Sequence, residues 1–409
     1  MIDRAKRLLI CTQWFDPEPT PKGFSFAAAL HQRGFEVDVL TGFPNYPEGR
    51  VYPGYRLRPY ERESFGGVNV HRVWLYPSHD RSAVRRGINY LSFAASVVVA
   101  GLTKVPRPNL VYAYHPPPTV GWAGALLASR FRAPLVIDVQ DLWPETVASS
   151  GMMRSGFAMR ALEVGCLWEY RRADRVVALS SGMADLLEAR GVPRKRLRVI
   201  RNWADERRLS SSWETAVRER ARTTIGNGFS VLFAGQMGQA QSLGNALESA
   251  ALTPEIRWVF MGGGTDRARL ERMAGERALA NVSFVDRVPL SEVGAWLEAA
   301  GALLVHLSDD PLYAASIPSK TQAYLLAGRP VLMAAAGDAA ALVADANAGV
   351  TCAPGRPERL AAAARRLAEM TPVERDRLGA NGHAYYKREL AFSVGVDAFA
   401  QLFHETIAH

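Results

Sequence analysis

Cysteine is scarce in this chain of 409 residues, which contains only Cys11, Cys166 and Cys352. The three are far apart, odd in number and at no metal-ligand spacing, so neither a disulfide framework nor a zinc site is expected. Long apolar runs are also absent, since none reaches the ~20 residues that span a bilayer. The basic start of the chain precedes only a short apolar run and is interpreted as a first buried strand, not as a signal peptide. We therefore expect a cytoplasmic protein.

Two nucleotide-binding motifs are missing as well. Neither GxGxxG nor GxxxxGK[ST] occurs, which argues against a nicotinamide dehydrogenase and a nucleoside triphosphatase. The net charge is +9 and the sequence pI is about 9.6, yet no nucleic-acid module or basic tail is present. Nucleic acid is therefore not the expected partner. A polyanion or an anionic membrane surface is the physical implication of this charge.

The pattern of strand, loop and helix repeats through two halves of the chain. Most strand candidates are continuous apolar runs, as in parallel sheets buried on both faces. In the first half they are Arg7–Cys11, Glu36–Leu40, Val68–Val73, Asn109–Ala113, Pro134–Val139, Arg175–Leu179 and Leu197–Ile200. In the second half they are Val231–Ala234, Trp258–Met261, Val282–Val285, Ala302–Leu307, Pro330–Met333 and Gly349–Cys352. We expect two doubly wound α/β domains, residues 1–201 and 229–390, with a charged linker over 202–228 and the active site in a cleft between the domains.

The segment Ser316–Leu332 (SIPSKTQAYLLAGRPVL) carries the most specific chemistry. Pro318 suits the start of a short helix, Ser319 and Lys320 fall in its first turn, and Gly328 ends it. A lysine there opposes the helix dipole unless an anion lies between them. The pattern predicts a bound phosphate, although an ordinary solvated lysine explains it equally well.

Glycine-rich loops follow other strands of the second half. Gly235 and Gly238, in AGQMGQAQSLG, would let backbone N–H groups approach a phosphate. Gly263 belongs to a third such turn, MGGG. No single glycine run is a strong signal alone.

Polar clusters also follow strands of the first half. DVQDLWPE contains Gln140, Asp141, Trp143 and Glu145, and a functional role is favoured over a simple helix cap. A proline- and aromatic-rich loop that contains Asn45 and Tyr46 could stack against sugar or polyprenyl groups, or could simply form a rigid connection. The helix start at Gly23 is another candidate. His115 is a further one, although a lone histidine is more often structural.

The segment Arg85–Lys104 has basic residues at both ends of an apolar helix-length run. Arg85 and Arg86 lie at its first end. Such a segment is typical of an interfacial membrane helix, and equally of a core helix with solvated flanks.

Together these segments resemble bacterial family-four glycosyltransferases of the WbuB and WcaI type. LTGFPNYPEGRVYPGY, DVQDLWPE, VIRNW, AGQMGQAQSLGNALESA and SIPSKTQAYLLAGRPVL follow the family's order and spacing over nearly the whole chain. The resemblance implies a GT-B fold of two Rossmann-like domains, with the final helix, 391–409, crossing back onto the first. It also implies metal-independent transfer, with retention, from a UDP-sugar, here an N-acetylated or deoxy-hexosamine. The implied acceptor is a polyprenyl-diphosphate-linked saccharide of O-antigen, capsule or exopolysaccharide assembly, reached at the inner face of the cell membrane.

The resemblance assigns roles to residues of both domains. Lys320, Gln140, Asp141 and Glu145 are the expected catalytic residues, with no metal ligand. The expected donor-binding residues are Gly235, Gln236, Gly238, Gln241, Gly263, Val288, Ser316, Pro318, Ser319 and Gln322. The expected acceptor-binding residues are Gly23, Asn45, Tyr46, Arg85, Arg86, His115 and Trp143. No protein nucleophile is needed, because the leaving diphosphate itself can deprotonate the acceptor once its charge is stabilised.

The sequence departs from the family at several of these positions. Gln236 and Gln241 lie where an Arg and a Lys are common, so more of the diphosphate charge is expected to fall on Lys320. The usual Glu-x7-Glu pair falls on Ala315 and Ala323. Gln322, Tyr324 and the loop Ser308–Ser316 are expected to substitute for it. A hydrolysing UDP-sugar epimerase and a non-catalytic sugar-nucleotide or lipid-carrier binding protein remain as alternatives.

Overall fold

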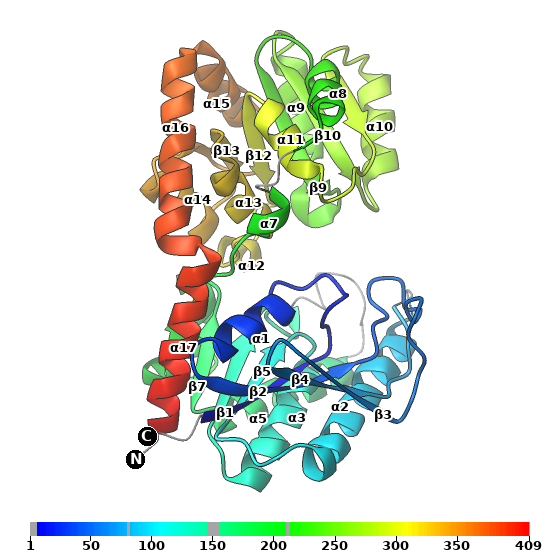
Figure 1. The fold of residues 1–409 in the computed structure, drawn as a ribbon. Coiled ribbons are helices and arrows are strands. Elements are labelled where there is room, and N and C mark those ends of the chain that lie inside the picture. Colours follow the sequence, from blue (N-terminus) through cyan, green and yellow to red (C-terminus); the bar gives the residue numbers. More distant parts are fainter. Residues whose placement is uncertain (1–5, 80–81, 146–155, 210–212, 409) are drawn as a thin grey trace. The chain divides into compact units, whose positions relative to one another are not determined.

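A computed structural model describes residues 6–79, 82–145, 156–209 and 213–408 (Figure 1). The chain forms two compact units, and each is described by itself. The first unit comprises Met1–Ile200 and Val396–His409, and the second comprises Arg201–Gly395.

The first unit contains an eight-stranded sheet in the order β3-β4-β2-β1-β5-β6-β7-β8. All neighbouring strands are parallel except β3 and β4. The strands are β1 (Lys6–Thr12), β2 (Phe35–Gly42), β3 (Tyr60–Phe65), β4 (Val68–Val73), β5 (Leu110–His115), β6 (Leu135–Val139), β7 (Arg175–Ala178) and β8 (Leu197–Val199). The order reverses between β1 and β5, and ligands of open α/β sheets bind outside the carboxyl ends of the strands at such a point.

The sequence did not predict β3, because its residues, YERESF, are mostly polar. This strand lies at the sheet edge and pairs antiparallel with β4, Phe65 opposite Val68. Gly66 and Gly67 connect the two strands with φ angles of 56° and 79°. Such positive φ angles at both positions of a two-residue hairpin turn favour glycine.

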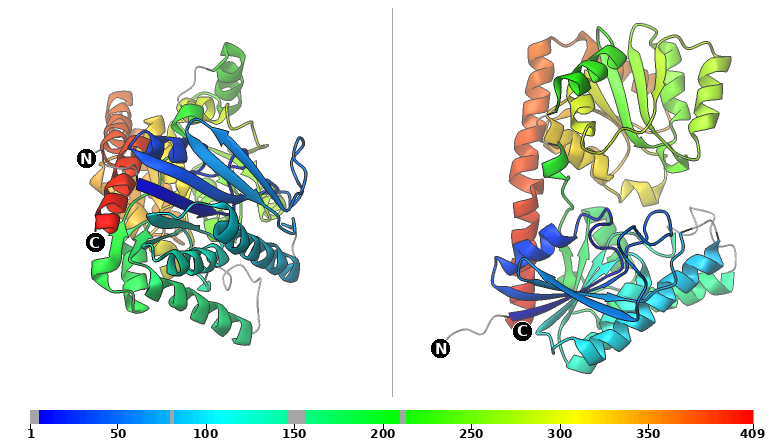
Figure 2. Two further views of the ribbon diagram at one scale, coloured as in Figure 1. Left: turned by 60° about the horizontal axis from the view of Figure 1, so that its bottom comes forward. Right: turned by 45° about the vertical axis from the view of Figure 1, so that its right-hand side comes forward.

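Helices cover both faces of this sheet. They are α1 (Phe24–His31), α2 (Ala83–Lys104), α3 (Pro118–Phe131), α5 (Gly156–Arg172), α6 (Ser181–Ala189) and, at the end of the chain, α17 (Phe392–Ala408). Figure 2 shows α2, α3 and α5 on one face and α1 on the other. From Val396 onward α17 belongs to the first unit, where Phe399 meets Phe26 of α1 with ring centroids 5.3 Å apart.

The second unit contains a six-stranded sheet in the order β11-β10-β9-β12-β13-β14. Its neighbouring strands are all parallel. The strands are β9 (Ser230–Gln236), β10 (Arg257–Gly263), β11 (Val282–Val285), β12 (Ala302–His306), β13 (Val331–Ala334) and β14 (Gly349–Cys352). This doubly wound order reverses between β9 and β12. The expectation of two doubly wound α/β sheets is confirmed.

Two apolar clusters pack on the sheet of the second unit. The helices that contribute to them or lie around them are α7 (Glu206–Leu209), α8 (Thr215–Ile225), α9 (Gly244–Leu252), α10 (Arg267–Glu276), α11 (Val293–Ala299), α12 (Pro311–Ala314), α13 (Ser319–Ala327), α14 (Asp338–Asp345), α15 (Pro357–Glu369) and α16 (Pro372–Tyr385). Residues 202–228 were expected to form a linker, and the structure corrects this expectation. It contains α7 and α8, and Ala221 and Ile225 of α8 belong to a core cluster of the second unit.

Within the described ranges of the chain, no helix is both long enough and apolar enough to cross a membrane.

Candidate functional site

The candidate donor site lies where β9 and β12 end, at the strand-order reversal of the second unit. The loop after β9 carries Gly235 and Gly238, and β12 ends at His306. The first turn of α13 adds Lys320. Pro318 caps this helix and Gly328 ends it with a φ of 67°, as the sequence indicates.

Lys320 is the most unusual of these residues. Its Nζ is buried and has no hydrogen-bond partner among the residues that the structure describes. Nζ lies 3.7 Å from the centroid of the Phe233 ring, which offers a weak cation–π contact. Burial lowers the pKa of Lys320 to about 7. A buried ammonium without a counter-ion is unfavourable, so this position is suited to an anion that arrives from outside the chain.

Glycine is required around Lys320 because the backbone comes very close. Gly235 has a φ of 142°, and a Cβ there would lie 3.4 Å from Lys320 Nζ. A Cβ on Gly262 would lie 2.0 Å from the Gly235 carbonyl oxygen. The Met237 amide donates to the Gly263 carbonyl at 2.8 Å. The two glycine-rich turns therefore hold each other, and Gly263 acts through this backbone contact.

Gln241 accepts a hydrogen bond from a backbone amide that could otherwise donate to a bound anion. Its Oε1 accepts a hydrogen bond from the Gly238 backbone N–H at 3.0 Å, at the start of a short 3-10 turn, η2 (Gln239–Gln241). Gln236 is exposed at the end of β9. Neither glutamine brings a positive charge to the loop after β9, and Lys320 is the cation that lies against Gly235. Arg267 and Arg287 lie at the neighbouring turn, where Arg267 donates to the Gly262 carbonyl at 2.8 Å and Arg287 lies beside Gly263.

Gln322 and Tyr324 point inward, which corrects the expectation that they replace the absent carboxylates. In the amide orientation that satisfies its neighbours, Gln322 donates to the carbonyls of Pro318 and Ser319. The Tyr324 hydroxyl accepts from the Ala234 amide at 2.9 Å. Both side chains are almost fully buried. They hold the site together rather than face a ligand.

The remaining expected donor-binding residues differ in exposure and in the contacts of their side chains. Ser316 donates from Oγ to the Leu312 carbonyl at 2.8 Å, so its hydroxyl supports α12. Ser319 is exposed at the first turn of α13. Val288 packs against the apolar core.

His306 was not predicted as a site residue. It ends β12, is 1% exposed, and its Nδ1 has no hydrogen-bond partner in the described part of the chain. Burial, together with the charge of Lys320, lowers the pKa of His306 to about 4. A histidine as the last residue of an apolar strand (ALLVH) is the sequence signal that could have found it.

The first unit has its own polar cluster at the carboxyl ends of its strands. Lys22, in the loop after β1, forms a fully buried ion pair with Asp138 of β6. Asp138 also accepts from the Tyr112 hydroxyl at 2.5 Å and from the Gln140 amide at 2.7 Å. Gln140 is thus oriented by a buried, charge-compensated network.

Asp141 follows this network, and burial raises its pKa. Burial raises the pKa values of Tyr46 and Tyr90, the Asp141 charge adds to both shifts, and Arg86 acts on Tyr90 in the opposite sense. These residues therefore gather at one end of α2. The Tyr46 ring lies 4.6 Å from that of Trp14, and the backbone amides of Asn45 and Tyr46 are both bound by the buried Glu18 carboxylate.

Glu145 and Trp143 have structural partners. The Glu145 carboxylate forms an ion pair with Arg190 of the segment after α6. Arg190 also donates to the Trp143 carbonyl at 3.0 Å. Because this ion pair occupies the Glu145 carboxylate, the structure favours a structural role over the expected catalytic one.

His115 is also corrected as an acceptor-binding residue, because it is 0% exposed. Its Nε2 lies 3.0 Å from Glu169 Oε1 of α5. His115, Cys166 and Glu169 bring ligand atoms within 4.8 Å of one another, and among the described residues this set could hold a metal ion. Burial raises the pKa of the Glu169 carboxyl, and the His115 ring acts on it in the opposite sense.

Gly23 is explained by packing rather than by an acceptor, which is a further correction. A Cβ there would lie 2.0 Å from Asp16 Oδ2. The Asp16 carboxylate accepts the hydrogen bond of the Phe24 amide, so it already occupies the positive end of α1. Arg85 is exposed at the start of α2.

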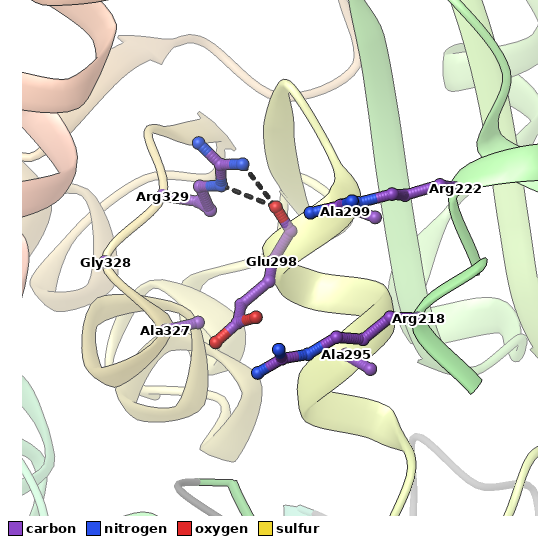
Figure 3. Close-up of a pocket in the computed structure, with 8 residues that line it drawn as sticks. All are labelled: Arg218, Arg222, Ala295, Glu298, Ala299, Ala327, Gly328 and Arg329. Atoms are coloured by element: carbon purple, nitrogen blue, oxygen red, sulfur yellow. Dashed lines mark hydrogen bonds between the residues drawn. The ribbon is translucent and has the colours of Figure 1, made fainter. Parts of the chain in front are cut away.

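A cavity of about 460 Å³ lies elsewhere in the second unit (Figure 3). It is lined by Arg218, Arg222, Ala295, Glu298, Ala299, Ala327, Gly328 and Arg329. Arg329 Nε donates to the Glu298 carbonyl at 2.8 Å. The last carbonyls of a helix lack partners within that helix, and Arg329 supplies one at the end of α11. Among the described residues that line this cavity, none belongs to the expected donor set.

Comparisons with known proteins agree with the two-unit division. Residues 25–203 match the family described as "Glycosyl transferase 4-like domain", and residues 218–385 match "Glycosyl transferases group 1". The putative colanic acid biosynthesis glycosyl transferase WcaI of Escherichia coli (strain K12) is 26% identical over 264 residues. This match spans 62% of the chain and 64% of WcaI, which is less than two thirds of that relative.

Solved structures share the fold. Sucrose-phosphate synthase from Thermosynechococcus elongatus has a TM-score of 0.73 at 17% identity, over 98% of this chain and 99% of that one. Anabaena HepE in complex with UDP-glucose has a TM-score of 0.67 at 18% identity, over 98% and 99%. WaaG, a glycosyltransferase involved in lipopolysaccharide biosynthesis, has a TM-score of 0.65 at 18% identity, over 97% and 99%. With a family match on each unit and this fold, the chain belongs to the bacterial family-four glycosyltransferases of GT-B fold.

Proposed function

We propose that this protein transfers a sugar from a UDP-sugar to a polyprenyl-diphosphate-linked saccharide during assembly of a bacterial surface polysaccharide. The observation that carries the proposal is the buried Nζ of Lys320 at the strand-order reversal of the second unit, which has no hydrogen-bond partner among the described residues. A diphosphate supplies the counter-charge that the described part of the chain lacks there. HepE, which shares the fold, binds UDP and UDP-glucose, and this supports UDP as the nucleotide.

The proposed chemistry needs no nucleophile from the protein and no metal. Lys320 and the amides of the glycine loops stabilise charge on the leaving diphosphate. An oxygen of that diphosphate then takes the proton of the acceptor hydroxyl on the same face of the sugar, so the anomeric configuration is retained. Gln140 and Asp141 orient hydroxyl groups. With Glu145 held by Arg190, Asp141 is the remaining candidate base of DVQDLWPE, and burial raises its pKa.

The acceptor is proposed to be lipid-linked because α2 has an exposed apolar stripe. The exposed large residues repeat at intervals that share one helix face: Val84 (72%), Ile88 (47%), Leu91 (56%), Val99 (63%) and Leu102 (45%). Arg85 and Lys104 lie at the two ends of α2. Such a helix is suited to an anionic membrane interface. At the first end, Arg86 and Tyr90 neighbour Tyr46 and Asp141.

Vesicle sedimentation tests this acceptor assignment. Leu91→Glu and Val99→Glu should abolish binding to vesicles that contain phosphatidylglycerol. Val373→Glu changes an exposed valine of the second unit and serves as the control. Equal binding of all variants would remove the membrane from the proposal.

The polysaccharide is proposed to be an O-antigen, capsule or exopolysaccharide, and the sugar an N-acetylated or deoxy-hexosamine. The likeness to WcaI, named for colanic acid biosynthesis, supports this class of product. Incubation with a panel of nucleotide sugars and a short-chain lipid-diphosphate saccharide, followed by mass spectrometry, tests it. Free UDP formed without any acceptor would indicate a hydrolysing epimerase instead.

A non-catalytic sugar-nucleotide binding protein is the second candidate. Ala315 and Ala323 favour it, because both family carboxylates are absent and Gln322 does not replace them. UDP binding without turnover of any donor would support this candidate.

A further inference from the structure

Two buried nitrogens without hydrogen-bond partners in the described part of the chain lie on different elements of the donor site. They are Lys320 Nζ, in the first turn of α13, and His306 Nδ1, at the end of β12. Within the described parts of the chain neither has a partner, and neither is reached by solvent. Buried polar nitrogens of native proteins are normally bonded, so both are suited to the same missing ligand.

The surroundings of His306 contain little charge. Lys320 is the charged side chain whose electrostatic effect reaches the ring, and the Gln241 backbone of η2 forms a hydrogen bond with it. On β13 the register partner of His306 is Ala334. After β12, the Ser308 amide donates to the Ala240 carbonyl at 2.9 Å, which holds the loop against η2. Burial and the nearby ammonium keep the ring neutral while no anion is bound, since its pKa is about 4.

A third donor is already aligned in the same loop. The Gly238 N–H is held by the amide oxygen of Gln241 at 3.0 Å. A phosphate oxygen is a stronger acceptor than a neutral amide oxygen and would replace it there. The amide of Gly238, the ammonium of Lys320 and the ring of His306 thereby offer three donors from three elements.

We infer that His306 is a second cationic ligand of the donor diphosphate, beside Lys320, and that diphosphate binding brings a proton from solvent onto its ring. The inference rests on the proposed function and deepens it. A bound dianion favours the protonated ring, because opposite charges in a buried site stabilise each other. His306 thus supplies part of the positive charge that Gln236 and Gln241 do not.

Proton uptake during UDP binding tests the inference. Calorimetric titration at pH 6 in two buffers of different ionisation enthalpy gives the number of protons taken up. Lys320 is already largely protonated at this pH, so its contribution is small. We expect His306→Gln to take up about one proton fewer than the wild type, and to bind UDP about 10-fold more weakly through loss of a charge-assisted hydrogen bond. The terminal phosphate of UDP titrates near pH 6 itself, and the difference between variants removes that contribution.

His383→Gln is the matched control, because His383 is an exposed histidine of the same unit whose ring is bonded to the Leu326 carbonyl. It should match the wild type in both readouts. His306→Asn provides a second variant, and circular dichroism checks that each is folded. Equal proton uptake by the wild type and a folded His306 variant, with UDP still bound, overturns the inference and leaves the proposed function intact. Absence of UDP binding by the wild type overturns both.

Discussion

Two buried lysines, one in each unit, follow prolines at the start of a helix and yet have opposite settings. Lys22, in TPKG, is neutralised within the chain by Asp138. Lys320, in PSKT, has no hydrogen-bond partner among the described residues and contacts the ring of Phe233. A buried charge that is compensated internally serves the fold, because removing its partner is costly. A buried charge left uncompensated indicates a ligand. The two sequence motifs look alike. Only the presence or absence of a tertiary partner distinguishes a structural lysine from a ligand-binding one.

The largest expected effect comes from breaking the compensated pair. Lys22→Met leaves the Asp138 carboxylate buried without its cation, so the free energy of unfolding should fall by about 3–5 kcal/mol. Urea denaturation measures this. The double variant Lys22→Met/Asp138→Leu should recover most of the loss. A loss in the single variant no larger than that of an exposed lysine would show that the pair is not needed.

The same substitution at Lys320 should impair turnover without lowering the free energy of unfolding. Lys320→Met should lower turnover by about 100-fold, since charge on the leaving diphosphate loses its main stabilising group. The protein should unfold at the same or higher urea concentration, because an unpaired buried ammonium is removed. Lys387→Met, at an exposed lysine of the same unit, is the control. Wild-type turnover in Lys320→Met would refute the comparison between the two lysines.

The pH dependence of UDP affinity sharpens the contrast. The pKa of Lys320 is about 7 in the free protein, and a bound diphosphate raises it. Binding above pH 7 therefore takes up a proton, and the dissociation constant should rise by about 10-fold per pH unit up to the pKa of the complex. Titrations from pH 7 to 9 measure the slope, and Lys320→Met should lack it. A flat wild-type profile would mean that Lys320 is not at the nucleotide.

A smaller effect is expected at the ion pair of Glu145 with Arg190, which is partly exposed at 45% and 20% of the two side chains. Glu145→Gln should change the free energy of unfolding by less than about 1 kcal/mol. Turnover should stay close to the wild type. A general base would instead cost about 100-fold or more, which would restore Glu145 to the catalytic set.

Metal removal should have no measurable effect. We expect EDTA to leave UDP binding and turnover unchanged, because the diphosphate charge is met by side-chain and backbone nitrogens. Loss of turnover on chelation, recovered by added Mg²⁺ or Zn²⁺, would contradict metal-independent transfer. If Cys166→Ser kept its activity, a loss of turnover on chelation could not be assigned to a metal bound by His115, Cys166 and Glu169.

The fold was largely predictable because apolar runs and helix-ending glycines are local signals. The strands on both sides of each strand-order reversal were expected, and α13 begins and ends as its proline and Gly328 indicate. The edge strand β3 was missed because it is polar, and α7 and α8 were missed because they are short and charged.

The site was less predictable because the partners of polar side chains lie far apart in sequence. Lys320 could be found from its helix-start motif. The sequence could not indicate that Glu145 pairs with Arg190, that His115 faces Glu169, or that Gln322 turns toward Pro318. Tertiary packing determines each of these partners. The direction in which a polar side chain points then decides whether it contacts a ligand or another part of the protein.

The last helix has a consequence for how the protein is made. Phe399 and Phe403, near the end of α17, pack against Tyr112 in the first unit, with ring centroids 5.7 and 5.2 Å apart. The first unit is therefore completed by residues that are synthesised only after all of Arg201–Gly395. During that interval the apolar surface around Tyr112 lacks the cover that Phe399 and Phe403 later provide.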